Sequence, residues 1–255
     1  MKYTVLSLFP EITDAYFAAS IMARAVSRGM VEYRAVNIRD FAPDRHRSCD
    51  DAPYGGGPGM LMLPEPLGRA LQSVGARRGG SPGSRVINLS PSGRLLDQGL
   101  AAELAREEEL ILICGRYEGV DQRIIDLYVD DEISVGDYVL SSGEVAALIL
   151  IDATYRLIDK VIRPESLAEE SFTGSLLEYP QYTRPELYDT IEVPAVLLSG
   201  HHEQIRRWRR RKQVEKTLAL RPDLIRRGEE QGLFDAETAH IIAELRGKDE
   251  RDTGD

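Results

Sequence analysis

Two glycine-bearing turns follow two strand-like runs between Leu110 and Glu144. The first turn spans residues 114–119 (CGRYEG), and the second region, 133–144, carries Gly136 and Gly143 and leads into an apolar helix. Glycine lets backbone N–H and C=O groups approach a ligand closely, because no Cβ stands in the way. The paired turns predict a small-molecule pocket lined largely by main chain. A purely structural pair of turns is the alternative.

Several other kinds of site do not fit the sequence. No G-x-G-x-x-G lies between a strand and a helix, as a dinucleotide fingerprint requires, and no Gly-Lys-Ser/Thr closes a phosphate-binding loop. Four histidines show no metal-ligand spacing, so no metal site is predicted. Cys49 and Cys114 are the only cysteines, which favours a reducing cytoplasm over a disulfide framework.

Positive charge is concentrated in one segment of an acidic chain. The formal net charge is −10, yet residues 206–216 read RRWRRRKQVEK and enclose the only tryptophan. The block follows Gly200-His201-His202, a helix-start region whose free N–H groups could hold phosphate. A solvated helix face is the alternative, but a one-signed block of this density predicts contact with a polyanion.

Strands alternate with helices over the first two thirds of the chain. Strands are predicted at 3–9, 31–37, 85–89 and 110–114, and helices at 11–27, 64–73, 97–107, 120–128 and 143–156. This alternation is typical of an α/β domain with a mostly parallel sheet. Loops are expected at 76–84 and 48–58, the latter a flap or rigid turn containing three consecutive glycines. The apolar start fits a first strand, and no apolar run reaches the roughly 18 residues that span a bilayer.

The 255 residues fit two domains. We predict an N-terminal catalytic domain over 1–162, a linker over 163–177, a small all-α domain over 178–246 and a disordered tail over 247–255. The second domain is expected to be helical from about residue 176, with breaks at Pro180, Pro185, Pro194 and Pro222.

An ordered set of landmarks resembles the bacterial tRNA (guanine-N1)-methyltransferases, which modify guanosine 37, just 3′ of the anticodon. The resemblance covers almost the full chain. Its landmarks are Leu8-Phe9-Pro10-Glu11, residues 50–60 (DDAPYGGGPGM), 89–94 (LSPSGR), 115–119 (GRYEG), 134–140 (SVGDYVL), 182–185 (YTRP) and 194–202 (PAVLLSGHH).

The resemblance implies a SPOUT-type trefoil-knotted N-terminal domain, an obligate homodimer with active sites across its interface, and S-adenosylmethionine as methyl donor. It also implies possible dependence on Mg²⁺, without naming ligands. The residues that it places around the donor are Leu89, Ser90, Pro91, Gly115, Arg116, Tyr117, Glu118, Gly119, Ile133, Ser134, Gly136, Tyr138, Leu140, Ser142 and Gly143. Ser142 replaces the family's usual glycine and is the less secure contact.

The chemistry needs a base for the N1 proton of guanine and a partner for the charge on O6. The family's arginine matches Arg156. Its catalytic aspartate does not match, because the chain has Glu170 at that position, one methylene longer, with Glu169 as the alternative base. The same departure is the only sequence support for another function, a knotted protein that binds tRNA and S-adenosylmethionine but has impaired catalysis.

Residues for tRNA binding are predicted on two segments. His46, Asp50 and Tyr54 lie on the flap that the family uses beside the target bases, and a carboxylate such as Asp50 can accept from a guanine edge, with a solvated loop acid as the alternative. The arginines expected to contact stem phosphates are Arg206, Arg207, Arg209 and Arg210.

Overall fold

The computed structural model describes residues 1–80, 82–162 and 170–252. The chain divides into two compact units, Met1–Ile162 and Arg163–Asp255, and each is considered by itself. Residues 163–169 of the predicted linker, including Glu169, lie outside the described residues, as do Ser81 and 253–255.

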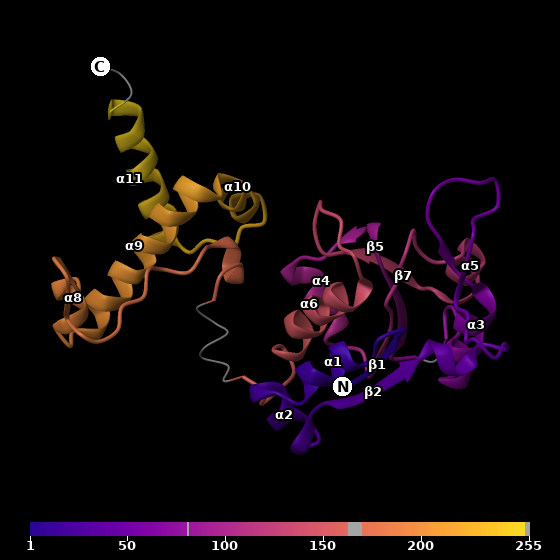
Figure 1. Cartoon of the computed structure of the whole chain (residues 1–255). Helices are drawn as coiled ribbons and strands as arrows, with labels where there is room; N and C mark the ends of the chain where they lie inside the picture. The colour runs from indigo at the N-terminus through magenta and orange to yellow at the C-terminus, as the bar shows by residue number, and fades with distance from the viewer. Residues whose placement is uncertain (81, 163–169, 253–255) are drawn as a thin grey trace. The chain divides into compact units, whose positions relative to one another are not determined.

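The first unit is built on a five-stranded sheet with the order β2-β1-β6-β5-β7 (Figure 1). All four neighbouring pairs are parallel, which confirms the predicted α/β class. The register places Leu6 beside Ile113 and Leu89 beside Ile133, so the carboxyl ends of the central strands meet at one edge. The strands are β1 (Lys2–Ser7), β2 (Glu32–Asn37), β5 (Ser84–Leu95), β6 (Glu109–Ile113) and β7 (Asp131–Ser134).

Helices cover both faces of this sheet (Figure 1). One face packs on α1 (Glu11–Phe17), α2 (Ser20–Ser27), α4 (Gln98–Leu104) and α6 (Gly143–Tyr155). The other packs on the 3-10 helix η1 (Ile38–Phe41), α3 (Pro64–Ser73) and α5 (Gln122–Tyr128). The central strands are apolar on both sides because both sides are buried, as in other parallel sheets. Leu112 faces one core and Ile111 the other.

The structure differs from the sequence expectations at three places in the first unit. The single helix predicted over 11–27 is two helices, because Ala19 is extended and Ser20 has φ 52°, which breaks the helical hydrogen bonding. Strand β5 continues past Leu89: residues 90–93 leave the ladder, and Leu95 then pairs with Ser134. The structure also contains a two-stranded ladder of β3 (Asp50–Asp51) and β4 (Leu61–Met62), in the segment expected to be a loop.

The second unit contains the predicted C-terminal helices around a small core. These are α8 (Ala195–Leu198), α9 (His202–Leu220), α10 (Pro222–Glu230) and α11 (Ala236–Asp252). The core joins Leu176 to residues of the three longer helices, including Val214, Ile225 and Ile242. Within residues 170–252, α-helix begins at Ala195; before it come the 3-10 helix η2 (Thr173–Ser175) and a hairpin of β8 (Leu187–Tyr188) and β9 (Ile191–Glu192) that the periodicity did not predict.

Among the described residues, no helix combines the length and the apolar character that crossing a membrane requires.

A buried hydrogen bond joins the first strand to α6. The Tyr3 hydroxyl lies 2.8 Å from Thr154 Oγ1, and both residues are fully buried. Tyr3→Phe should lower the free energy of unfolding by about 1 kcal/mol, because Thr154 Oγ1 loses this partner while its bonds to helix carbonyls remain. Urea denaturation measures the change. Tyr54→Phe is the control, since Tyr54 is fully exposed and its substitution should change the value by less than about 0.5 kcal/mol.

Candidate functional site

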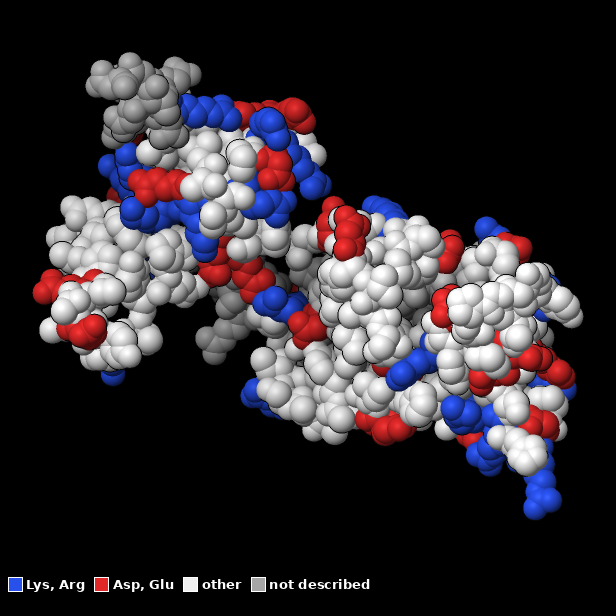
Figure 2. Space-filling model, turned by 45° about the horizontal axis from the view of Figure 1, so that its top comes forward, with Lys and Arg blue, Asp and Glu red and all other residues white. Residues whose placement is uncertain are grey.

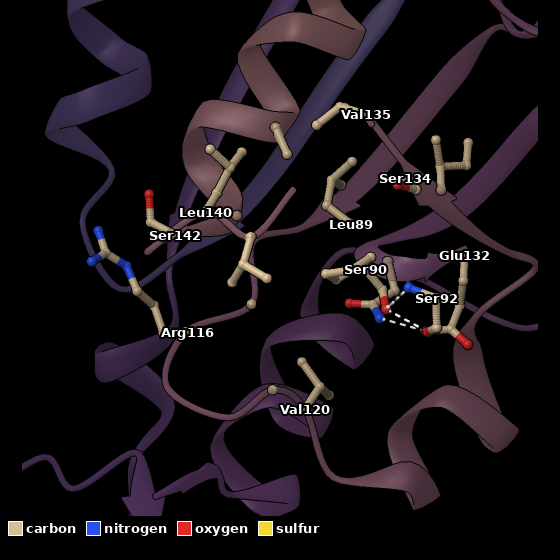
Figure 3. A pocket seen from close by; sticks show the side chains of 18 of the residues that line it. Leu89, Ser90, Ser92, Arg116, Val120, Glu132, Ser134, Val135, Leu140 and Ser142 are labelled. Carbon is tan, nitrogen blue, oxygen red and sulfur yellow. Dashed lines mark hydrogen bonds between the residues drawn. The ribbon is translucent and has the colours of Figure 1, made fainter. Parts of the chain in front are cut away.

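A cavity of about 390 Å³ lies beyond the carboxyl ends of β5, β6 and β7. Its volume falls in the range of small-molecule sites, about 300–1,000 Å³. All fifteen residues predicted to bind the donor line it, from Leu89 on β5, through the 115–119 turn, to Gly143 at the start of α6. Figure 3 shows Leu89, Val135 and Leu140 on one side of this cavity, and Ser90, Ser92 and Glu132 grouped on another.

The tyrosines of the two turns are rim residues of the cavity. Tyr117 is 47% exposed and Tyr138 is 51% exposed, so neither is the ordinary core residue that each could have been. Tyr117 adopts a left-handed backbone with φ 57°, which is uncommon for a residue with a side chain. Burial, together with the neighbouring Asp50 carboxylate, raises the pKa of the Tyr117 hydroxyl.

Backbone groups meet where the two glycine turns touch. The Gly143 N–H donates to the Gly115 carbonyl at 2.8 Å. A Cβ on Gly143 would lie 2.5 Å from the Gly115 nitrogen and 2.7 Å from the Cys114 Cα, closer than any side-chain carbon can approach. Glycine at position 143 is therefore required by packing of main chain on main chain, which brings the first turn of α6 against the end of β6. The adjoining Ser142 is buried and lines the cavity.

Sequence reasoning missed one polar part of this cavity. Asn88 and Glu132 stand opposite each other on β5 and β7, and the Asn88 amide donates to a Glu132 carboxylate oxygen at 3.0 Å. Asn88 Oδ1 is buried and has no hydrogen-bond partner within the described part of the chain. Strand alternation gave a signal for Asn88, since a polar residue inside an apolar run at a strand end often faces a ligand. The partner across the sheet could not be read from the sequence.

The predicted substrate residues on the flap do not share one environment. Asp50 is half-buried in β3, paired with Met62, whereas Tyr54 and His46 are exposed. Tyr54 lines a second cavity of about 560 Å³, together with Asp51 and Arg123. Asp50 is close enough to Tyr117 to affect its hydroxyl, so the flap and the rim of the first cavity adjoin each other.

The two predicted catalytic residues belong to different units of the chain. Arg156 caps the C-terminus of α6 and is half-buried. Glu170 is half-buried at the start of the described part of the second unit, where its carbonyl accepts from the Thr173 N–H at 3.3 Å. The following turn is fastened by Ser171, whose Oγ accepts from the Glu178 N–H at 3.0 Å. Glu170 therefore stands on a tight turn attached to the helical unit.

The basic block on α9 is paired extensively with carboxylates. Arg206 contacts Glu203 and Glu237 at 3.0 and 2.7 Å, and Arg207 contacts Glu203 at 2.9 Å. These arginines lower the pKa of the exposed Glu203 to about 2. The Arg209 guanidinium lies 4.7 Å from the centre of the Tyr179 ring. Figure 2 shows the resulting mixture of blue and red atoms on the helical unit. This surface is a charge network rather than the one-signed face that the sequence indicated.

The comparisons with known proteins agree with one another. The family described as tRNA (Guanine-1)-methyltransferase TrmD matches residues 1–227. A tRNA (guanine-N(1)-)-methyltransferase from Treponema denticola is 60% identical over 245 residues, covering 96% of this chain and 99% of the relative. One of the same name from Treponema pallidum is 58% identical, covering 96% of each chain, and one from Borrelia turicatae is 56% identical over 226 residues, covering 88% and 92%. The chain belongs to the tRNA (guanine-N1)-methyltransferase family.

Proposed function

We propose that this protein transfers a methyl group from S-adenosylmethionine to N1 of guanosine 37 in tRNA. The observation that carries the proposal is the cavity, because the fifteen residues that the resemblance assigns to the donor all line it. Family membership supports methylation of guanine in tRNA. The position within the tRNA and the identity of the donor rest on the resemblance.

The cavity has the chemistry that an adenosine-containing donor needs. Leu89, Ile133 and Leu140 offer apolar surface for a base, and the glycine turns offer main-chain groups for its edge and for ribose hydroxyls. When bound, the donor supplies an electrophilic methyl group on a sulfonium centre. We infer that residues near the Gly143–Gly115 contact are threaded as the family's trefoil knot, since the start of α6 lies against the end of β6.

In the proposed reaction, Glu170 accepts the N1 proton of guanine as the N1–methyl bond forms and the sulfur–methyl bond breaks. Arg156 stabilises the negative charge that develops on O6. Positioning by the rest of the site can lower the activation free energy by several kcal/mol, because the attacking nitrogen, the methyl group and the sulfur must be aligned.

A homodimer is part of the proposal. Its support is α6, whose inner residues Leu150 and Ile151 are fully buried while Val145 and Ile149 leave 43% and 40% of their surface exposed. A helix that is apolar all round is normally covered on all sides. A second copy would provide this cover. The proposed location is the cytoplasm, where tRNA is modified and where the two buried free cysteines would stay reduced.

Magnesium was the second expected cofactor. Within residues 1–80, 82–162 and 170–252, no three or more His, Cys, Asp or Glu side chains form a group that could hold a metal ion.

Gly143→Ala should abolish donor binding, because the added methyl would have to displace the main chain of the 115–119 turn. Isothermal titration with S-adenosylmethionine measures the affinity, and we expect a loss of at least 100-fold, about 2.7 kcal/mol. Gly99→Ala, in the first turn of α4, is the control, since its Cβ would meet only the Asp97 side chain and donor affinity should not change. Unaltered affinity in Gly143→Ala would contradict the main-chain site.

Glu170→Gln should reduce single-turnover methyl transfer to unmodified tRNA by about 100-fold or more, as expected for loss of a general base. Glu170→Asp should retain activity, because it restores the family's usual carboxylate. Near-full turnover in Glu170→Gln would show that Glu169 or another group is the general base. An inactive wild type that becomes active in Glu170→Asp would instead identify a protein with impaired catalysis.

Replacing Arg206, Arg207, Arg209 and Arg210 with glutamine should weaken tRNA binding and flatten its dependence on salt. Each lost phosphate contact should reduce the log–log slope by about 0.7–0.9. Filter binding at several salt concentrations measures this slope, while S-adenosylmethionine affinity serves as the control and should not change. An unchanged slope would show that α9 does not contact phosphate.

A further inference from the structure

A carboxylate next to the donor cavity is completely buried. Glu144 follows Gly143 in the first turn of α6 and has 0% of its surface exposed. Its Oε1 accepts from Ser7 Oγ at 2.5 Å, and its Oε2 accepts from Arg116 Nε at 3.1 Å. Glu144 therefore ties together the end of β1, the 115–119 turn and the start of α6. Ser7 and Glu144 are 137 residues apart in the chain.

Phe9 completes this cluster. Ser7 Oγ also accepts from the Phe9 N–H at 2.8 Å, and the Arg116 guanidinium lies 4.6 Å from the centre of the Phe9 ring. The Arg39 guanidinium lies 5.6 Å from the same ring. A cation over an aromatic face is attracted by the ring quadrupole. The Leu8-Phe9-Pro10 landmark thus provides a surface on which the Arg116 side chain is fixed.

The Arg116 side chain is oriented by this cluster. Figure 3 shows it extending toward the Ser142 side of the cavity, away from Ser90, Ser92 and Glu132. Its Nε is used by Glu144 and its guanidinium plane by Phe9. The only other charged residues that line the cavity are Glu118 and Glu132. Arg116 is the one cation in the described cavity wall, and Glu144 already neutralises it. A carboxylate of the donor would therefore find no unpaired cation there.

The 115–119 turn has two sets of attachments. Strand β4 and the residue before it hold its far end, because Met62 N–H donates to the Gly119 carbonyl at 3.0 Å and Glu118 N–H donates to the Met60 carbonyl at 2.9 Å. Its near end is held by the Gly143–Gly115 backbone bond and by the Arg116–Glu144 pair. Glu144 is fully buried and Arg116 keeps 22% of its side chain exposed. An ion pair with a buried member often contributes little net stability compared with apolar residues of the same volume, so its use here favours a role in specifying geometry.

We propose that Glu144 is a positioning residue for the methyl donor: its buried carboxylate holds Arg116 as a strut that fixes the 115–119 turn, and Arg116 is not the ligand of the donor's carboxylate. The inference rests on the proposed function, since it assumes that the cavity binds S-adenosylmethionine. It changes the expected role of Arg116 from direct contact to support.

The test uses two adenosine ligands that differ in the chain that carries the carboxylate. S-adenosylhomocysteine carries the amino-carboxypropyl chain, and 5′-methylthioadenosine lacks it. Affinities of both are measured by isothermal titration for the wild type, Glu144→Gln and Arg116→Gln. Glu103→Gln is the control. Glu103, on α4, forms an ion pair with Arg85 at 2.7 Å and does not line the cavity.

We expect Glu144→Gln and Arg116→Gln each to weaken both ligands by at least tenfold and by the same factor, with tRNA affinity unchanged. The control should bind like the wild type. A loss confined to S-adenosylhomocysteine in Arg116→Gln would overturn the proposal, since it would identify Arg116 as the carboxylate ligand. Equal affinity of Glu144→Gln and wild type would overturn it as well.

A further variant distinguishes a role of Glu144 in positioning the donor from a purely structural role. Ser7→Ala removes the hydrogen bond to Glu144 and the acceptor of the Phe9 N–H, and keeps both charges, so it should weaken both ligands several-fold at a temperature where circular dichroism shows a folded protein. If Glu144→Gln does not fold, Ser7→Ala and Arg116→Gln decide the question, and wild-type affinity in Ser7→Ala would then contradict the proposal. A wild type that binds neither ligand would reject the proposed function itself.

Discussion

The contact between Gly143 and the Gly115 backbone is the constraint on which the cavity depends. Because no Cβ fits between these segments, the first turn of α6 lies directly against the end of β6. The strand ends of a parallel sheet would otherwise be separated from a following helix by side chains. Direct contact of main chain with main chain leaves backbone groups of both turns at the cavity wall. A ligand held there is recognised by groups whose positions are set by the fold.

Around this contact, buried polar side chains connect segments that are distant in sequence. Ser7, Arg116 and Glu144 join three elements, and Asn88 with Glu132 joins two strands. Each buried polar group needs a partner in a defined direction, so such clusters fix geometry more strictly than apolar packing does. The apolar layers on the two faces of the sheet provide the stability. The polar clusters at its carboxyl edge provide the shape of the site.

The surface of the helical unit carries arginines and their carboxylate partners. The arginines of α9 are paired with carboxylates, which limit the net positive charge of this surface. A phosphate group that bound to these arginines would have to compete with Glu203, Glu237 and Glu244. Such exchange reduces the gain from charge alone and makes binding depend on geometry. Part of the chain's excess of acidic residues is thus used to pair the arginines of the basic helix α9.

The sequence by itself determined the α/β class, four of the five strands of the sheet, most helices of the first unit, the glycine turns and the helical character of the C-terminal region, because these depend on local periodicity and on backbone preferences. Part of the charge network was also local, since Glu203 lies three and four residues before Arg206 and Arg207. The break at Ser20, the return of β5 after residue 93 and the hairpin at 187–192 were not predicted, because they interrupt or lack the regular periodicity on which the prediction relied. Only the tertiary structure decided that Glu144 meets Ser7 and Arg116, or that Arg211 pairs with Glu244, 33 residues away. Partners of this kind are chosen by the path of the chain through space, for which a single sequence contains no periodic signal.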